Sequence, residues 1–321
     1  RDMNLMDSRR SLALVGSECV LQLPSRWVDA WSFEKALLQC GDLLGAGFTS
    51  VIIRFPVGCR LMIDVAIRLL SLCNQIVAMT KRLRLEFAEG AYAIRGYLDR
   101  MGFFDHLSRE VIVIPTRPIV SGARIHRGGN RGLVEIERFS RSSEPDQNLV
   151  PRLAHAVQRS CACRGDVKEI GDSIFNIFGE LIGNVFEHSG TALDAYAALQ
   201  TYPRGNRVTV AVSDSGIGII DSLRPALVRK DSPFATSSEV DLLVEIFREG
   251  ISRHDDDKRG LGLMASAHSA IRFKADLDVR LLRQRVLLKP ANGHYRPNTA
   301  YSQEELPLLW GTHIAFSLDL S

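Results

Sequence analysis

Four short segments in the second half of the chain carry residue types that suit binding of a phosphate-bearing ligand. Each combines glycine with a carboxylate, an amide, a hydroxyl or a basic side chain. The segments are FGELIGN (178–184), DSGIG (214–218), RGLGL (259–263) and WGT (310–312). Taken singly, each also fits an ordinary turn or a helix cap, so their order along the chain has to carry the argument.

Asp214 and the two glycines after it suit recognition of a flat base. Asp214 follows a predicted strand, and a carboxylate in that place can accept a hydrogen bond from an exocyclic amine. Gly216 and Gly218 would let a planar ring approach the main chain, because they lack a β-carbon.

The third segment suits phosphate. Gly260, Leu261 and Gly262 form a glycine turn that leads directly into a predicted helix. Free N–H groups and the helix dipole at such a turn hold phosphate oxygens. Lys258 and Arg259 either neutralise phosphate charge or offset the acidic run 255–257, and the sequence leaves both alternatives open.

Glu180 and Asn184 lie one turn apart in a predicted helix, from Gly171 to Ser189. Asn184 can hold a hydrated Mg²⁺ ion, and Glu180 can orient or deprotonate a water molecule. Gly179 and Gly183 lie beside them, although each glycine costs a helix about 1 kcal/mol relative to alanine. The alternative is a solvated polar stripe on a core helix.

The elements that must position these residues follow from apolar periodicity. The helix 171–189 repeats apolar residues every three or four positions, and Asp172 or Ser173 can cap its start. A helix from Gln147 to Ala162 precedes it. Strands 193–202 and 207–213 follow it, joined by a turn at 203–206.

Strands alternate with helices in the first half of the chain, which predicts an α/β sandwich. The expected strands are 19–24, 50–56, 82–87 and 111–115. The expected amphipathic helices are 31–44, 61–77 and 91–101. Residues 1–17 are a lead-in, and 117–146, rich in Arg, Gly and Ser, are expected to be loop and linker. Its arginines raise RNA binding as an alternative, but no aromatics interleave with them, which favours a solvated loop.

Composition restricts the function classes. The 321 residues suggest two domains, and 45% hydrophobic with 24% charged residues is typical of globular protein. A net charge of +3 does not indicate nucleic acid, and no apolar run is long enough to cross a membrane. The six scattered cysteines favour reduced, buried thiols, and hence a cytoplasmic protein.

The order of the four segments resembles the GHKL superfamily of DNA gyrase, heat-shock chaperones, histidine kinases and mismatch-repair ATPases. The resemblance covers residues 147–321 and implies a Bergerat-fold α/β sandwich that binds ATP and Mg²⁺ under a mobile lid, 221–259. It implies Asn184 as the Mg²⁺ ligand, Glu180 as the catalytic base and Asp214 as the acceptor for the adenine amine. The remaining implied contacts are Gly216 and Gly218 at the base, Gly260, Leu261 and Gly262 at the phosphates, and Thr312 near the adenine or an ordered water.

Residues 18–116 resemble the STAS fold of anti-sigma-factor antagonists, through the order of their elements and GYLDRMGFFDHL (96–107). Regulatory members of that family carry a phosphorylatable serine in a loop after a strand. The corresponding loop here, FPVGCRLM (55–62), has no serine or threonine, and Cys59 is its nearest nucleophile. We therefore expect this half to be a scaffold or docking module.

These patterns predict an enzyme, an ATP hydrolase acting as a nucleotide-driven regulatory switch for a protein partner. One alternative is a protein kinase of the anti-sigma-factor serine kinase type, acting on a target in trans. A second is a non-catalytic nucleotide-sensing binding module. Histidine autophosphorylation is disfavoured, because His155, the one candidate on a helix, lacks the acidic neighbour of such sites. The partner's identity stays open, and so does a homodimer.

Overall fold

The computed structural model describes residues 17–140, 146–188, 191–249, 268, 271–293, 295 and 300–321, without the side chains of 180, 184–188, 247–249, 300 and 301. Gly260, Leu261, Gly262 and the adjoining Lys258 and Arg259 therefore lie outside the described residues. Within the described part the chain is a mixed α/β protein, and no helix there has the length and apolarity needed to span a bilayer.

Four parallel strands form the first sheet, in the order β1-β3-β5-β6. They are β1 (Glu18–Gln22), β3 (Ser50–Phe55), β5 (Arg82–Phe87) and β6 (Ile112–Ile114). The connecting helices are α1 (Ala30–Cys40), α2 (Ile63–Ala78), α3 (Tyr92–Met101) and α4 (Phe103–His106). A short parallel pair, β2 (Trp27–Val28) and β4 (Arg60–Leu61), lies before α1 and α2. The predicted alternation of strands and helices is confirmed.

Seven antiparallel strands form the second sheet, in the order β12-β11-β10-β13-β9-β8-β7. They are β7 (Leu133–Phe139), β8 (Ala195–Tyr202), β9 (Arg207–Ser213), β10 (Asp276–Arg280), β11 (Arg285–Leu288), β12 (Ala300–Gln303) and β13 (His313–Asp319). The other helices are α5 (Gly122–His126), α6 (Leu149–Ser160), α7 (Val167–His188), α8 (Ile219–Arg229) and α9 (Glu239–Glu249).

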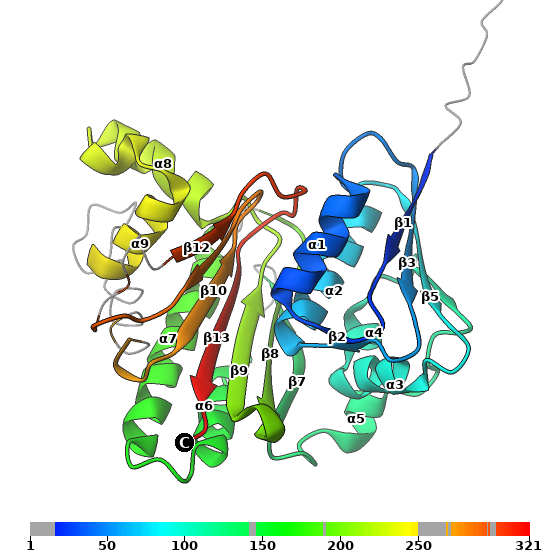
Figure 1. Cartoon of the computed structure of the whole chain (residues 1–321), viewed down its shortest axis with the longest axis horizontal. Coiled ribbons are helices and arrows are strands. Elements are labelled where there is room, and N and C mark those ends of the chain that lie inside the picture. The colour runs from blue at the N-terminus through cyan, green and yellow to red at the C-terminus, as the bar shows by residue number, and fades with distance from the viewer. Residues whose placement is uncertain are drawn as a thin grey trace, which may run out of the picture.

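Both faces of the second sheet are covered (Figure 1). Alternate residues of β9 point to opposite faces, so Val210 packs with the core of α6 and α7 while Ala211 packs with the core of α2. Ala198 and Ala315, on the strands either side, also face α2. These three small side chains let the helix lie close against the sheet.

Helix α2 is buried on nearly all sides, whereas the sequence predicted an amphipathic helix. Its buried residues include the polar side chains Arg68, Ser71 and Gln75. A helix lying between two sheets has no solvent face, so its polar residues must find partners inside the protein. The two halves of the chain therefore share the core around α2, which is separate from the core of α6 and α7.

A buried ionic cluster crosses the same interface. Glu34 of α1 accepts hydrogen bonds from Arg68 of α2 at 3.1 Å and from Arg280 of β10 at 3.0 Å. Arg68 also lies 3.4 Å from Asp278, which pairs with Arg285. Removing one partner would leave an uncompensated buried charge, so the cluster fixes how the first sheet and its helices meet the second sheet.

Two expectations about boundaries are wrong. Residues 117–146 are not simply loop and linker, because they include α5 and the edge strand β7, which is paired with β8. Helix α7 begins at Val167, so Asp172 and Ser173 lie inside it rather than capping it. Its first turn is closed by the hydrogen bond from Ile170 N–H to the Asp166 carbonyl, 3.0 Å long.

Candidate functional site

Asp214 and Thr312 meet where β9 ends and β13 begins. The Asp214 carboxylate accepts hydrogen bonds from Gly216 N–H, at 2.7 Å, and from Thr312 N–H, at 3.2 Å. Asp214 N–H donates to the Thr312 carbonyl at 3.1 Å. Residues 98 positions apart in sequence are thus joined through both side chain and main chain.

Glycines make this close approach sterically allowed. Gly311 has φ of +94°, and a β-carbon there would lie 2.1 Å from the Asp214 carbonyl oxygen. Gly218 has φ of +85°, and a β-carbon there would lie 2.4 Å from a methyl group of Leu282. The sequence predicted that Gly218 leaves room for a base. The structure shows that it first leaves room for Leu282.

Helix α8 starts directly beside Asp214. Ile219 N–H, in its first turn, donates to Thr312 Oγ1 at 2.8 Å. The threonine hydroxyl therefore satisfies one of the free N–H groups that open the helix. Asp214, Gly216, Gly218 and Thr312 are thus brought together, as the sequence predicted.

The Asp214 carboxyl is partly exposed but closely surrounded by protein. Burial raises its pKa from 3.8 to about 6, against the opposing effect of the Gly216 and Thr312 N–H groups. An ionised carboxylate has about four acceptor positions, and the two N–H groups use two of them. Asp214 can therefore still accept a hydrogen bond from a ligand.

This pKa predicts a specific pH dependence of stability. Because the folded protein holds the Asp214 proton more tightly than the unfolded chain, Asp214 stabilises the fold below about pH 4, and this contribution is lost as pH rises through about 6. The loss should be on the order of 2 kcal/mol. Between pH 4 and pH 7.5 the unfolding free energy of the wild type, measured with urea, should fall by this much more than that of Asp214→Asn.

The comparison with Asp214→Asn subtracts the pH dependence that the two proteins share. Asp172→Asn, at an exposed position, is the matched control for removal of one negative charge. A wild-type-minus-variant difference that is constant with pH would contradict the assignment.

Helix α7 runs toward Asp214 along the same face of the sheet. Arg164, just before α7, donates to the Asp319 carbonyl at the far end of β13, at 2.9 Å. In mid-helix, the ring of Phe178 packs edge-on against Phe316, with centroids 5.9 Å apart. Asn184 lies about 9 Å farther along the helix, and Thr312 lies about 13 Å farther along β13 in the same direction.

Glu180 and Asn184 therefore belong to the half of α7 that approaches Asp214, although their side chains are outside the described part. Nothing described lies within 4 Å of a β-carbon built at Gly179 or Gly183. Packing among the described residues thus does not require these two glycines.

The predicted lid is helical as far as the structure describes it. Ser238 caps α9, since Asp241 N–H donates to its hydroxyl at 3.1 Å. Leu242, Leu243, Val244 and Ile246 of α9 are buried. Helices α8 and α9 therefore pack on the core before the chain reaches residues 260–262.

The loop 55–62 of the N-terminal half holds no reactive nucleophile. Cys59 is buried, and burial raises the pKa of its thiol to about 12. All six cysteines are free thiols. A thiol with such a pKa is not ionised at neutral pH, which agrees with the expected packing role.

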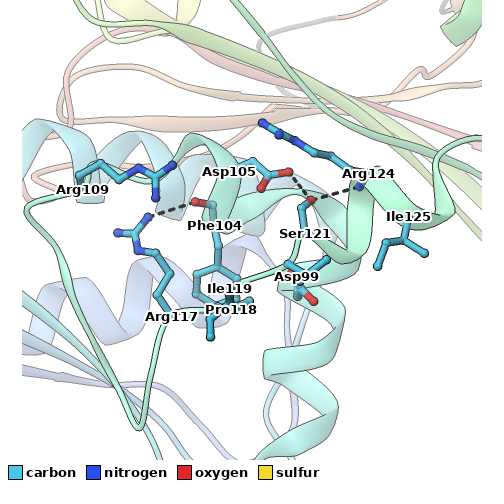
Figure 2. A pocket seen from close by; sticks show the side chains of 11 residues that line it. Asp99, Phe104, Asp105, Arg109, Arg117, Pro118, Ile119, Ser121, Arg124 and Ile125 are labelled. Carbon is cyan, nitrogen blue, oxygen red and sulfur yellow. Dashed lines mark hydrogen bonds between the residues drawn. The ribbon is translucent and has the colours of Figure 1, made fainter.

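A cavity of about 420 Å³ lies in the N-terminal half, against the segment 117–125 (Figure 2). Arg117, which lines it, donates to four main-chain carbonyls at 2.6 to 3.3 Å, those of Phe104, Leu107, Ser108 and Val111. Ser121 donates to Asp105 at 2.6 Å and caps α5. Arg117 thus fixes the main chain between Phe104 and Val111, whereas the sequence predicted that it lies in a solvated loop.

Sequence reasoning missed the polar residues on the opposite side of the site, namely Ser213, Ser215 and His313, and their partners on α2. Alternation along β9 and β13 could have indicated that these residues face away from Asp214. Nothing local indicated α2 as the partner. Among the described residues, no group of three or more His, Cys, Asp or Glu side chains is arranged to hold a metal ion.

Comparison with known proteins provides no family assignment. No protein-family model matches the chain, and no curated protein matches it.

Proposed function

We propose that this protein binds Mg-ATP beside Asp214 and Thr312 and uses it as a nucleotide-driven switch for a protein partner. The observation that carries the proposal is the carboxylate of Asp214, held by two N–H groups with acceptor capacity to spare. Its place between Gly216, Gly311 and Thr312 suits the exocyclic amine of adenine.

The arrangement of elements supports a Bergerat-type ATP-binding domain. Helices α6 and α7 lie on the same face of the antiparallel sheet, and α8 starts at the site. The four parallel strands with connecting helices support a STAS-like N-terminal domain. Because strands β7 and β8 pair, we place the ATP-binding domain from about residue 133, not 147.

Catalytic roles for α7 are part of the proposal. Asn184 would hold Mg²⁺, which would supply positive charge to the phosphates, and Glu180 would activate water. Gly260, Leu261 and Gly262 would bind phosphate oxygens through their N–H groups. No described residue lies within 4 Å of a β-carbon built at Gly179 or Gly183, which supports a ligand against this helix. Hydrolysis rather than mere sensing follows from having an acid at position 180.

The kinase alternative requires a target in trans. The loop 55–62 contains no serine or threonine, and its Cys59 is a buried, protonated thiol. A non-catalytic sensor is the second alternative. The free thiols support a cytoplasmic location.

Calorimetric titration with Mg-ATP and Mg-GTP tests the nucleotide site. Guanine presents a carbonyl oxygen where adenine presents an amine, so the Asp214 carboxylate should repel it. We expect ATP to bind and GTP to bind at least about tenfold more weakly. Asp214→Ala should weaken ATP binding by about 10- to 100-fold, the effect of one hydrogen bond to a charged group. Asp172→Asn should bind like the wild type.

Equal binding of ATP and GTP would contradict adenine recognition by Asp214, and absence of ATP binding would overturn the proposal. Terminally labelled ATP, incubated with the protein and cell lysate, separates the activities. Label released only as phosphate supports the switch. Label transferred to a lysate protein, and lost with Glu180→Gln, supports the kinase.

A further inference from the structure

The main chain that carries Asp214 and Thr312 has a second side, which faces the N-terminal half. Ser213, Ser215 and His313 are directed there, toward α2. All three are almost completely buried, with exposed fractions of 0%, 4% and 2%. Along these strand ends the side chains therefore point alternately to the proposed nucleotide site and to the α2 interface.

Gln75 of α2 binds both strand ends through its side-chain amide. Its Nε2 donates to Ser215 Oγ and to the Trp310 carbonyl, each at 2.9 Å. Its Oε1 accepts from Trp310 N–H, also at 2.9 Å. The fully buried amide therefore uses both donors and one acceptor to join the residue after Asp214 to the residue before Gly311.

A second chain of hydrogen bonds runs beside it. His313 Nε2 lies 3.1 Å from the Trp310 carbonyl, which can only accept, so Nε2 carries the proton. Nδ1 then accepts from Ser213, whose oxygen lies 2.7 Å from Ser71 Oγ of α2. Burial, with Arg68 and Arg280 nearby, holds the His313 pKa well below its ordinary value, which keeps the ring neutral.

We infer that Gln75 is a positioning residue for the adenine-recognition segment, so that docking of α2 on the sheet and nucleotide binding are energetically coupled. Trp310 cannot shift independently, because Gly311 already lies against the main chain of Asp214. Displacement of α2 therefore displaces the Asp214 carboxylate, and by reciprocity nucleotide binding strengthens the docking of α2. The nucleotide in this inference rests on the proposed function, whereas the positioning of Asp214 by Gln75 rests on the hydrogen bonds described above.

Gln75→Ala in the full chain tests the coupling. Coupling free energies between sites correspond to about 5- to 150-fold changes in affinity, and we expect Mg-ATP to bind at least about fivefold more weakly. Asn74→Ala is the matched control. Asn74 neighbours Gln75 on α2 and also makes part-buried hydrogen bonds, with Tyr196 OH at 2.7 Å, the His106 carbonyl at 3.1 Å and Ser108 N–H at 2.9 Å, and none of these partners lies in residues 310–315. The affinity of Asn74→Ala for Mg-ATP should stay within twofold of that of the wild type.

Titration of the Asp214 carboxyl by NMR, assigned by its absence in Asp214→Asn, keeps the test independent of nucleotide. The pKa of about 6 should fall toward its ordinary value in Gln75→Ala, because the displaced carboxyl gains water, and should not change in Asn74→Ala. Ser215→Ala removes one hydrogen-bond partner of Gln75 and should also lower the pKa of Asp214.

If the wild type binds no ATP, the proposed function fails while the titration still decides the positioning role. An Asp214 pKa unchanged in both Gln75→Ala and Ser215→Ala would overturn the inference. An equal loss of affinity in Gln75→Ala and Asn74→Ala would also overturn it, since it would show only general damage to the interface.

Discussion

Gly311→Ala is expected to destabilise the protein by about 2–5 kcal/mol and to abolish binding of Mg-ATP. The left-handed backbone costs a non-glycine residue about 1–2 kcal/mol, and overpacking typically adds about 1–3 kcal/mol. A β-carbon here would lie 2.1 Å from the Asp214 carbonyl oxygen and 2.6 Å from its carboxylate. These Asp214 atoms cannot move aside as a flexible side chain would, because Asp214 is hydrogen-bonded to Thr312 through both its side chain and its main chain. Urea unfolding and calorimetric titration measure the two effects.

Gly128→Ala is the matched control for backbone strain. Gly128 has φ of +71°, and nothing described lies within 4 Å of a β-carbon built there. It should lose only about 1–2 kcal/mol and retain nucleotide binding. Equal destabilisation of the two variants would show that strain alone acts at Gly311, and that its contact with Asp214 is not critical.

Glu180→Gln is expected to lower Mg-dependent phosphate release by at least about 100-fold, while affinity for Mg-ATP changes by less than about threefold. General-base catalysis contributes typically 10²–10⁴-fold to rate, and glutamine has nearly the shape of glutamate but cannot take a proton. Loss of turnover with retained binding would assign Glu180 to the chemical step. The measurement pairs a phosphate-release assay under single-turnover conditions with equilibrium titration.

Glu169→Gln provides the control on the same helix. Glu169 is exposed in the first turn of α7, far from the half that approaches Asp214. The turnover of Glu169→Gln should equal that of the wild type. Equal phosphate release by Glu180→Gln and the wild type would remove the catalytic role, and the non-catalytic sensor would then be the better account.

Much of the local structure could be predicted from the sequence. Strand β9 spans Arg207–Ser213, as predicted, because alternation of Val208, Val210 and Val212 with smaller residues is a local signal. The carboxylate after it, Asp214, and Thr312 were predicted to serve one site, and the structure joins the two residues by a hydrogen bond. Such features depend on residue type and short spacing, and both are visible without a partner.

The partners themselves were decided only by the tertiary structure. Apolar periodicity shows which face of a helix can be buried, but it does not show what covers that face or whether the other face is covered too. Helix α2 lies between two sheets, so Gln75 reaches Trp310, 235 residues away, and Glu34 reaches Arg280, 246 residues away. Buried polar groups must be paired wherever the fold brings them together, and that pairing leaves no local pattern. The sequence by itself therefore predicted which residues meet where β9 ends and β13 begins, while the fold decided that the opposite side of the same strand ends is held by α2.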